Sequence, residues 1–170
     1  MDFAWTCACC GKDYKTLPFA YGFDQPDNWH GVPEQQRQHR TTLGTDTCTI
    51  DEREFYIRGC IVIPVIDHAD PFVWGAWASV SEKSFDRLGE LWEVEIREHE
   101  PPFFGWLSNH NPIYPTTTNL KLNVVLNNSG VRPSFVLEPT DHPLAIEQRN
   151  GITLDRVKEI ASKILQHRKD

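Results

Sequence analysis

The sequence predicts an α+β fold in which a single domain is built on a largely antiparallel sheet. Segments typical of strands follow one another through the middle of the chain, an amphipathic helix is inserted among them at residues 82–98, and an apolar helical stripe follows residue 153. The length of 170 residues suits one domain with its own core. We therefore expect one domain over residues 1–170, with residues 1–32 forming a cysteine turn and an ordered loop packed on it.

The segment of residues 12–32 contains glycine, proline and many aromatic side chains. Its aromatic content is too high for a disordered linker, so we expect an ordered loop. Pro33 then precedes seven polar residues, 34–40, which predict a short helix. Proline suits the first helical position, and Glu34 favours the positive end of the helix dipole.

The middle of the chain predicts three consecutive antiparallel strands between residues 46 and 80. Residues 47–50 and 55–65 are rich in β-branched and aromatic side chains and flank a charged turn, which is the pattern of a hairpin. Residues 71–80 carry large apolar side chains on both faces, as expected for a central strand with a covering layer on each side. The side chains expected to be buried are those of Ile57, Ile61, Ile63 and Trp74.

Ser81 is a suitable N-cap for the inserted helix over residues 82–98. Apolar residues recur along it at spacings of three and four, namely Phe85, Leu88, Trp92 and Ile96. We expect the first three of these to pack on the sheet. The residues expected to face water are Arg87, Glu90 and Glu93.

Further strands follow a proline pair that ends this helix. Residues 103–107 and 131–137 are short strand-like segments, and apolar residues alternate with polar ones over 120–126. The C-terminal helix has Thr153 as its N-cap. Its apolar stripe consists of Leu154, Val157, Ile160, Ala161, Ile164 and Leu165.

The composition argues against two classes of partner. The formal net charge is −7, from 17 basic and 24 acidic residues, and the basic residues are scattered. Because nucleic-acid binding depends on clustered lysine and arginine, we expect no nucleic-acid partner. No apolar run approaches the roughly 20 residues of a membrane span, and the cysteine cluster follows Met1 too closely for a signal peptide. We expect a cytoplasmic protein that binds no membrane.

Three of the five cysteines fall within four positions, at Cys7, Cys9 and Cys10. In a reducing cytoplasm such thiols stay free unless they bind a metal or take part in redox chemistry, so the first interpretation is metal binding. Cys7 and Cys10 are separated by two residues and followed by Gly11, a pattern typical of half a zinc site. We therefore expect Cys7 and Cys10 to bind zinc, with Cys9 as a spacer.

A tetrahedral zinc site needs two more ligands, and the sequence has no second pair of cysteines at this spacing. Cys48 is the first candidate, because it lies at the start of the predicted hairpin, where a strand would hold it rigidly. His30, His39 and Cys60 are the alternatives, although Cys60 lies in an apolar strand and is expected in the core. The predicted ligands are thus Cys7, Cys10 and Cys48, with the fourth left open, and such a closed site would be structural.

The cysteine turn is also compatible with a site that binds no metal. The thiols could be reduced and unligated, or two of them could form a redox pair. Burial of Phe3 and Trp5 could anchor the N-terminal segment, with the thiols as bystanders. A metal bond to Cys48 would instead tie this segment to the sheet.

A second polar group of residues surrounds His142. Glu138 precedes it and Glu147 follows it, and a carboxylate beside a histidine can support general base catalysis. Pro139 and Pro143 flank the histidine, however, so a rigid turn rich in polar residues is the simpler interpretation. The usual signatures of catalytic and nucleotide-binding sites are absent from the sequence.

A series of short motifs resembles the bacterial family called domain of unknown function 2199. The resemblance spans nearly the whole chain, and its specificity comes from the order of the motifs. In this sequence they are Cys7-x-x-Cys10-Gly11, Leu17-Pro18, Asp46-x-Cys48-x-Ile50-Asp51, Phe55-x-Ile57-Arg58-Gly59, Trp74-Gly75-x-Trp77, Phe104-Gly105-Trp106-Leu107 and His142-Pro143-Leu144-Ala145-x-Glu147-Gln148. The resemblance implies a small bacterial cytoplasmic protein with no assigned reaction.

Taken together, the sequence favours a non-enzymatic protein-binding module with a structural zinc knuckle. Its acidic charge and aromatic content suit a basic protein partner. The rival hypothesis is a hydrolase-like enzyme that uses His142 with Glu138 or Glu147, in a cleft lined by the aromatic strand residues. Aromatic residues at strand spacing form a core more often than a cleft for a ligand or partner.

Overall fold

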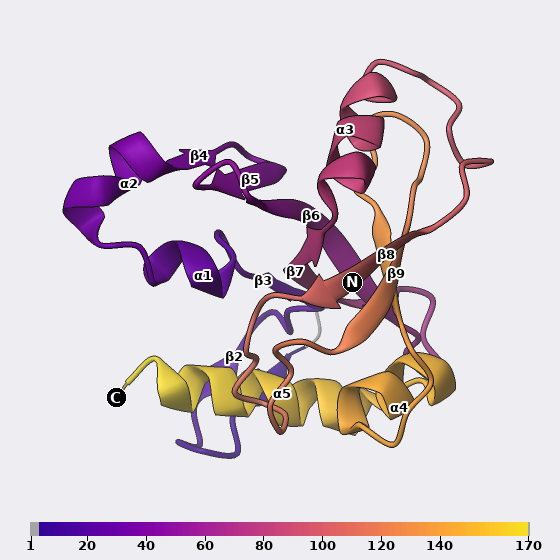
Figure 1. The fold of residues 1–170 in the computed structure, drawn as a ribbon. Coiled ribbons are helices and arrows are strands. Elements are labelled where there is room, and N and C mark those ends of the chain that lie inside the picture. Colours follow the sequence, from indigo (N-terminus) through magenta and orange to yellow (C-terminus); the bar gives the residue numbers. More distant parts are fainter. Residues whose placement is uncertain (1–3, 170) are drawn as a thin grey trace.

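The computed structural model describes residues 4–169 of the chain, and Figure 1 shows the arrangement of its elements. The strands are β1 (Trp5–Thr6), β2 (Asp13–Tyr14), β3 (Ala20–Gly22), β4 (Thr41–Leu43), β5 (Thr47–Ile50), β6 (Glu54–Ile63), β7 (Phe72–Val80), β8 (Phe103–Leu107), β9 (Lys121–Val125) and β10 (Ser134–Leu137). The helices are α1 (Asp27–His30), α2 (Glu34–Arg40), α3 (Glu82–Glu90), α4 (Pro143–Asn150) and α5 (Leu154–His167).

β6 and β7 form a long hairpin at the centre of the sheet. They pair antiparallel over the whole of β7, and β5 pairs antiparallel with the start of β6. Ile57, Ile61, Ile63 and Trp74 are each at most 3% exposed. The three antiparallel strands predicted between residues 46 and 80, and their buried side chains, are therefore confirmed.

The strands β6 to β10 close into a five-stranded barrel. β7, β8, β9 and β10 pair antiparallel in chain order, and β10 then returns to β6, where Ser134 lies parallel to Cys60. At this junction the Cys60 N–H donates a hydrogen bond to the Pro133 carbonyl at 2.9 Å. The predicted α+β fold with a largely antiparallel sheet is confirmed, and the structure adds that the sheet is closed.

The barrel closes tightly where β10 crosses β6. Gly59 faces the ring of Phe135, which is fully buried, and a Cβ at position 59 would collide with that ring. Glycine is therefore required here for packing, because any side chain would push the two strands apart.

Short strands extend the sheet beyond the barrel. β3 pairs parallel with β7, and β4 pairs antiparallel with β5. The predicted polar helix over residues 34–40 is confirmed as α2, with Pro33 at its N-cap. The region expected to be an ordered loop contains β2, β3 and the short helix α1.

Helix α3 is shorter than predicted. The Oγ of its N-cap Ser81 accepts a hydrogen bond from the Ser84 N–H at 3.1 Å, as expected, but the helix ends at Glu90 instead of extending to residue 98. Leu88 is buried, which confirms one position of the predicted stripe. Trp92 is 43% exposed, so its predicted packing on the sheet is wrong. Ile96, the last residue of the stripe, is 62% exposed.

A buried arginine binds the carbonyl of the C-cap residue Leu91, just after the helix ends at Glu90. Arg97 is 7% exposed, and its Nη1 donates a hydrogen bond to the Leu91 carbonyl at 3.2 Å. Its Nε donates to the Asn127 carbonyl at 2.8 Å, which joins this segment to the β9–β10 loop. In a continued α-helix the Leu91 carbonyl would accept from the N–H of residue 95, whereas here it accepts from the Val94 N–H at 3.0 Å and from Arg97.

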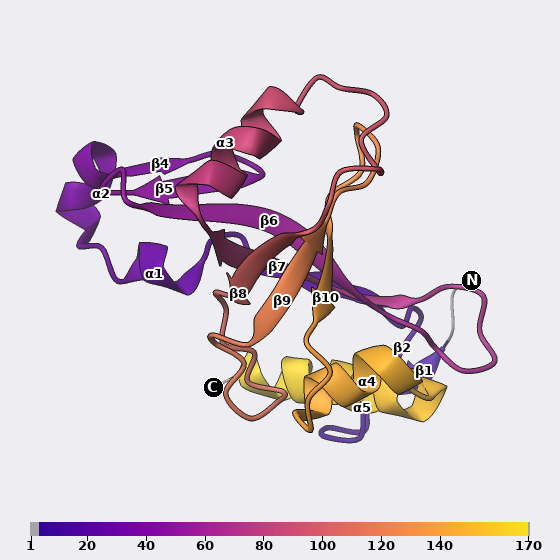
Figure 2. The same cartoon turned by 45° about the vertical axis from the view of Figure 1, so that its right-hand side comes forward.

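The last two helices lie at the end of the barrel opposite α3, as Figure 2 shows. The Oγ1 of Thr153 caps α5 by accepting a hydrogen bond from the Arg156 N–H at 3.1 Å, and the predicted C-terminal helix is confirmed. Val157, Ile160 and Ala161 on α5 are buried in the main core. None of the helices within residues 4–169 combines the length and the apolar character that crossing a bilayer requires.

The buried side chains form two clusters on opposite faces of the β6–β7 hairpin. The larger cluster fills the barrel and extends to α4 and α5. The smaller one consists of Val32, Cys48, Ile50, Tyr56 and Trp77, with Phe23 and Trp29 packed against it. β7 thus contributes to both clusters, as predicted for a strand with large apolar side chains on both faces.

Candidate metal centre

The cysteine turn lies between β1 and β2, which pair antiparallel over two residues each. The Cys7 N–H donates to the Lys12 carbonyl and the Gly11 N–H donates to the Cys7 carbonyl, each at 2.8 Å. Gly11 has a φ of +68°, in the left-handed region that glycine adopts without strain. These bonds fold residues 7–12 into a compact turn that contains all three clustered cysteines.

The turn brings three sulfur atoms together. The Sγ atoms of Cys7, Cys9 and Cys10 lie within 4.8 Å of one another, and those of Cys7 and Cys9 are 2.8 Å apart. Cys7 is 1% exposed, whereas Cys9 and Cys10 are exposed. Sulfurs that share one tetrahedral zinc ion are about 3.7 Å apart, so the cluster is compact enough to hold a metal ion.

The contact between Cys7 and Cys9 makes the two thiols differ in acidity. Their hydrogen bond lowers the pKa of Cys7 to about 6 and raises the pKa of Cys9 to about 11, because one sulfur keeps the proton that the other accepts. Burial acts against this shift at Cys7, and a weaker hydrogen bond with Ser162 supports it. A thiolate is therefore present in the cluster at neutral pH, and the thiolate is the form that binds metals.

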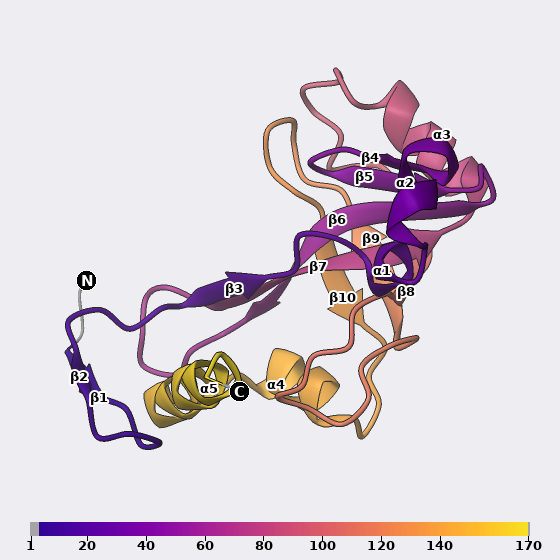
Figure 3. The ribbon, with the colours of Figure 1, turned by 90° about the vertical axis from the view of Figure 1, so that its left-hand side faces the viewer.

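Helix α5 lies behind the turn, and Figure 3 shows β1 and β2 beside it. Ser162 on this helix is buried, and its Oγ accepts a hydrogen bond from the Ala8 N–H at 3.1 Å. Beyond the helix, the negative charge available on Cys10 raises the pKa of Lys169. The turn therefore contacts the opposite end of the chain through a hydroxyl group and an ammonium group.

Trp5 anchors the first strand of the hairpin. It is 5% exposed, its ring stacks on Tyr14 with centroids 5.2 Å apart, and its Nε1 donates a hydrogen bond to the Thr16 carbonyl at 2.9 Å. Phe3, the second anchor that the sequence suggests, lies outside the described residues. The buried side chain of Trp5 and the three clustered thiols thus lie in the same short hairpin, and the first of them already anchors it to the core.

The structure does not bring Cys48 to the three sulfurs. Cys48 packs in the smaller core cluster, whereas Cys7 belongs to the larger one on the other face of the β6–β7 hairpin. Burial raises the pKa of Cys48 to about 11, which keeps its thiol protonated. The sequence could show that Cys48 lies on a rigid strand, but not that this strand faces away from the cysteine turn.

The remaining candidate ligands also lie elsewhere. His30 belongs to α1 and His39 to α2, and within the described part of the chain no histidine or acidic side chain completes a group with the three sulfurs. Cys60 is half-buried and belongs to neither core cluster, so its expected place in the core is wrong.

Cys9, predicted to be a spacer, lies in the cluster of three sulfurs. The crowding of three cysteines into four positions is the signal that could have identified it.

His142 caps a helix. Its Nδ1 accepts a hydrogen bond from the Leu144 N–H at 3.1 Å, at the start of α4. Its Nε2 lies 3.2 Å from the Pro115 carbonyl oxygen and 3.1 Å from that of Thr116. Because carbonyls only accept, Nε2 carries the proton, and both ring nitrogens are occupied by backbone groups.

The two carboxylates of the rival hypothesis are not bound to this histidine. Glu147 accepts hydrogen bonds from the Tyr114 hydroxyl at 2.6 Å and from Arg156 Nε at 2.8 Å. Glu138 is exposed, and within residues 4–169 no hydrogen bond joins His142 to either glutamate. The geometry therefore resembles the rigid turn that the flanking prolines indicated.

The comparison with protein families gives one match. A family model described as "Uncharacterized protein conserved in bacteria (DUF2199)" matches residues 6–152, which include the cysteine turn and the whole barrel. No curated protein and no solved structure matches the chain significantly. The chain belongs to this uncharacterised bacterial family.

Proposed function

We propose that this family member is a non-enzymatic protein-binding module whose N-terminal turn binds one zinc ion through Cys7, Cys9 and Cys10. The observation that carries the metal site is the convergence of three sulfur atoms within 4.8 Å. The ion stabilises the turn in its position against α5, where Ser162 Oγ accepts a hydrogen bond from the Ala8 N–H of the turn. The zinc site is structural in this proposal.

The ligand chemistry supports zinc. Thiolates are soft ligands that favour zinc and copper(I) over magnesium or calcium, and zinc is bound by four ligands in structural sites. Three ligands come from the turn, so a closed structural site takes its fourth ligand from a side chain of the bound partner. The ammonium group of Lys169 beside Cys10 offsets part of the negative charge of a three-thiolate site.

The surroundings of the cluster support a structural role over a hydrolytic one. A catalytic zinc ion activates a water molecule, and a nearby histidine or carboxylate commonly takes up its proton. Within the described residues the polar neighbours of the sulfurs include a hydroxyl, of Ser162, and an ammonium group, of Lys169. Neither is a good general base at neutral pH.

The outer face of the barrel supports the binding role. Phe104 and Trp106 on β8 are 51% and 38% exposed, and their rings meet edge to face with centroids 5.2 Å apart. Val136 on β10 is 47% exposed and lies in one row with Phe104, because both pair with Asn123 of β9. We call Phe104, Trp106 and Val136 the apolar strip. Exposed apolar surface of this kind is typical of interaction sites.

An acidic groove adjoins the apolar strip and indicates the chemistry of the partner. Phe104 also lines a groove between α3 and β8, where four acidic side chains outnumber two basic ones. The acidic residues are Glu82, Asp86, Glu90 and Glu100, and the basic ones are Lys83 and Arg87. A basic protein segment that carries an apolar anchor complements both surfaces.

Cobalt substitution tests the metal site. Cobalt(II) bound by thiolates has a charge-transfer absorption, and we expect the wild-type protein to develop this band at one equivalent of cobalt and to lose it when zinc is added. The Cys9→Ser variant should show a weaker band, because one thiolate is lost. Cys60→Ser is the matched control with all three clustered thiols intact. A full band in Cys9→Ser, or none in the wild type, contradicts the proposed ligand set.

A synthetic peptide tests the binding face independently. We expect a lysine-rich peptide with one central tryptophan to bind the wild-type protein, and Phe104→Ala to weaken this binding severalfold. Ile66→Ala is the control, because Ile66 is a similarly exposed apolar side chain, 52% exposed, outside the apolar strip. Equal effects of the two substitutions would show nonspecific association and contradict the proposed face.

A further inference from the structure

A second cavity lies at the end of the barrel near α3 and has no part in the metal site. Its volume is about 670 Å³, and it is open to solvent on one side and lined by β6, the segment after α3 and the loop between β9 and β10. This volume is in the range of small-molecule sites, about 300–1,000 Å³. The two loops are joined by a hydrogen bond from the Ser129 N–H to the Glu95 carbonyl at 2.9 Å, so this part of the cavity wall is formed by ordered backbone.

The cavity is cationic although the protein is acidic. Three arginines line it, Arg58, Arg97 and Arg132, against two carboxylates, Asp46 and Glu93. The whole chain has a net charge of −7, so an excess of positive charge in one cavity is a local feature of the fold. It indicates a negatively charged ligand.

Arg97 is the buried charge in this cavity. It is 7% exposed, and its side chain donates to two backbone carbonyls, those of Leu91 and Asn127. It forms no ion pair with any carboxylate of residues 4–169, and its Nη2 has no hydrogen-bond partner among them. A buried guanidinium without a negative partner is costly, and a bound anion would supply that partner.

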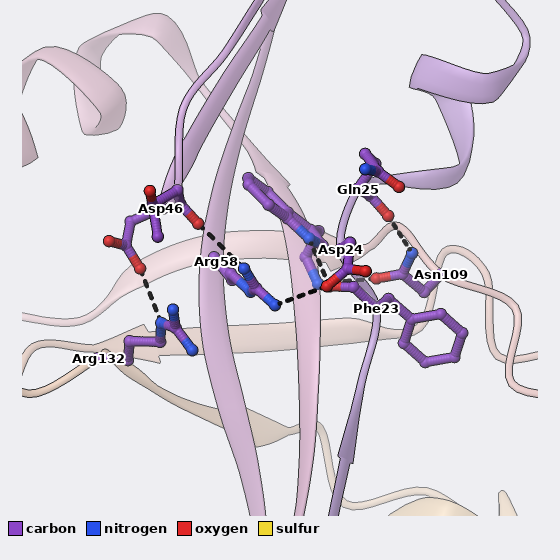
Figure 4. A network of polar contacts seen from close by, with 9 residues as sticks. Phe23, Asp24, Gln25, Asp46, Arg58, Asn109 and Arg132 are labelled. Atoms are coloured by element: carbon purple, nitrogen blue, oxygen red, sulfur yellow. Dashed lines mark hydrogen bonds and ion pairs between the residues drawn. The ribbon is translucent and has the colours of Figure 1, made fainter.

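Arg132 is the accessible charge. Its Nε donates to Asp46 Oδ1 at 2.7 Å, which leaves both of its terminal nitrogens without a partner in the described residues, and its side chain is 42% exposed. Figure 4 shows Asp46 beside both arginines: its carboxylate accepts from Arg132, and its backbone carbonyl accepts from the Arg58 N–H at 2.9 Å. The Arg58 guanidinium donates to Asp24 and to the Thr45 carbonyl, and its buried Nε has no hydrogen-bond partner among the described residues. Arg97 and Arg132 have free terminal nitrogens for a ligand.

The same cavity has an apolar wall. Trp92 and Val131 line it and are 43% and 56% exposed, and the buried side chains of Leu88 and Ile57 lie deeper in it. Trp92 is the residue whose predicted packing on the sheet is wrong. A ligand with an apolar part would cover these two exposed side chains.

We infer that this cavity binds a small organic anion, with its carboxylate or phosphate group between Arg97 and Arg132 and its apolar part against Trp92 and Val131. Guanidinium groups bind both kinds of anion through paired hydrogen bonds. The inference is independent of the zinc site, because none of the cavity residues belongs to the cysteine turn.

Two substitutions that break the same ion pair test this inference. Isothermal titration calorimetry measures the binding of phenyl phosphate and phenylacetate to the full chain. Arg132→Gln removes a ligand-binding charge and should weaken both affinities about tenfold. Asp46→Asn removes the competing carboxylate and should strengthen both. A merely structural ion pair would make the two variants change in the same direction, which would overturn the proposal.

Controls separate this site from general surface binding. Arg40→Gln also breaks an exposed ion pair, between Arg40 and Asp51, but lies outside the cavity and should leave both affinities unchanged. Trp92→Ala should weaken the binding of both organic anions and leave the weak binding of inorganic phosphate unchanged. No measurable binding of either organic anion, or equally tight binding of neutral phenylacetamide, would overturn the proposal.

Discussion

The barrel and the N-terminal hairpin differ in what holds each of them. In the barrel, β6 and β7 pair over residues 55–63 and 72–80, and their inward side chains are among the most buried of the described residues. In the hairpin, β1 and β2 pair over two residues each, and the buried side chains are those of Trp5 and Cys7. A closed sheet with a large apolar core needs no ligand, whereas a two-stranded hairpin is marginally stable without additional contacts.

The cysteines inside and outside the hairpin differ as well. Cys48 lies on β5 and Cys60 on β6, and burial raises the pKa of both thiols, which keeps them protonated. Thiols of the hairpin are close together, and their mutual hydrogen bond keeps one of them ionised at neutral pH. The region with the smaller core is therefore the one whose thiols are prepared to bind a metal.

The largest expected effect is on the barrel. Trp74→Ala removes a side chain that is 3% exposed and whose Nε1 donates to the Tyr114 hydroxyl at 3.2 Å. We expect the free energy of unfolding to fall by about 3–5 kcal/mol, as for other large-to-small changes in a core. Urea denaturation measures it, and Trp106→Ala on the exposed face of β8 is the control with a much smaller expected loss. Equal losses would show that Trp74 is not a core residue.

A smaller effect is expected where the barrel closes. Gly59→Ala places a Cβ against the ring of Phe135, and we expect a loss of about 1–3 kcal/mol from overpacking. Gly89→Ala is the control, because a Cβ at this helical position has no atom within 4 Å and should be tolerated. If the two variants have the same urea midpoint, the tight contact between β6 and β10 is not required for stability.

Local elements were predictable from the sequence and closure of the sheet was not. The β6–β7 hairpin follows from its β-branched and aromatic residues, and the caps at Ser81 and Thr153 follow from side-chain chemistry. Closure depends on a pairing between Ser134 and Cys60, which are far apart in the chain and have no local signature. Such long-range pairing is outside the reach of periodicity.

The candidate metal site was predictable only in part, for a related reason. Cys7 and Cys10 could be assigned because ligands within one turn are close by necessity. Cys48 was a long-range assignment, and it depended on which face of a strand meets which element. The early end of α3 was likewise hidden, because the buried arginine that follows it, Arg97, is held by the carbonyl of Asn127, 30 residues away in the chain.

The smallest expected effect is a titration in the hairpin. In the metal-free protein, ultraviolet absorbance should show one thiolate forming with a midpoint near pH 6, because the Cys7–Cys9 hydrogen bond lowers the pKa of Cys7 to about 6. The thiolate is present above this pH and is lost as the pH falls through it. Cys9→Ser should move the midpoint upward, towards that of an ordinary thiol. An unchanged midpoint would assign the low pKa to another cause.

The zinc content of protein purified without added metal tests the metal site most directly, by mass spectrometry of the metal released per chain. We expect about one zinc ion per chain in the wild type and in Cys48→Ala, and a large loss in Cys7→Ser and Cys9→Ser. Circular dichroism of each variant shows whether the barrel is still folded. Wild-type protein without stoichiometric zinc, or an equal loss of zinc in Cys48→Ala and Cys9→Ser, would contradict a zinc ion held by the cysteine turn.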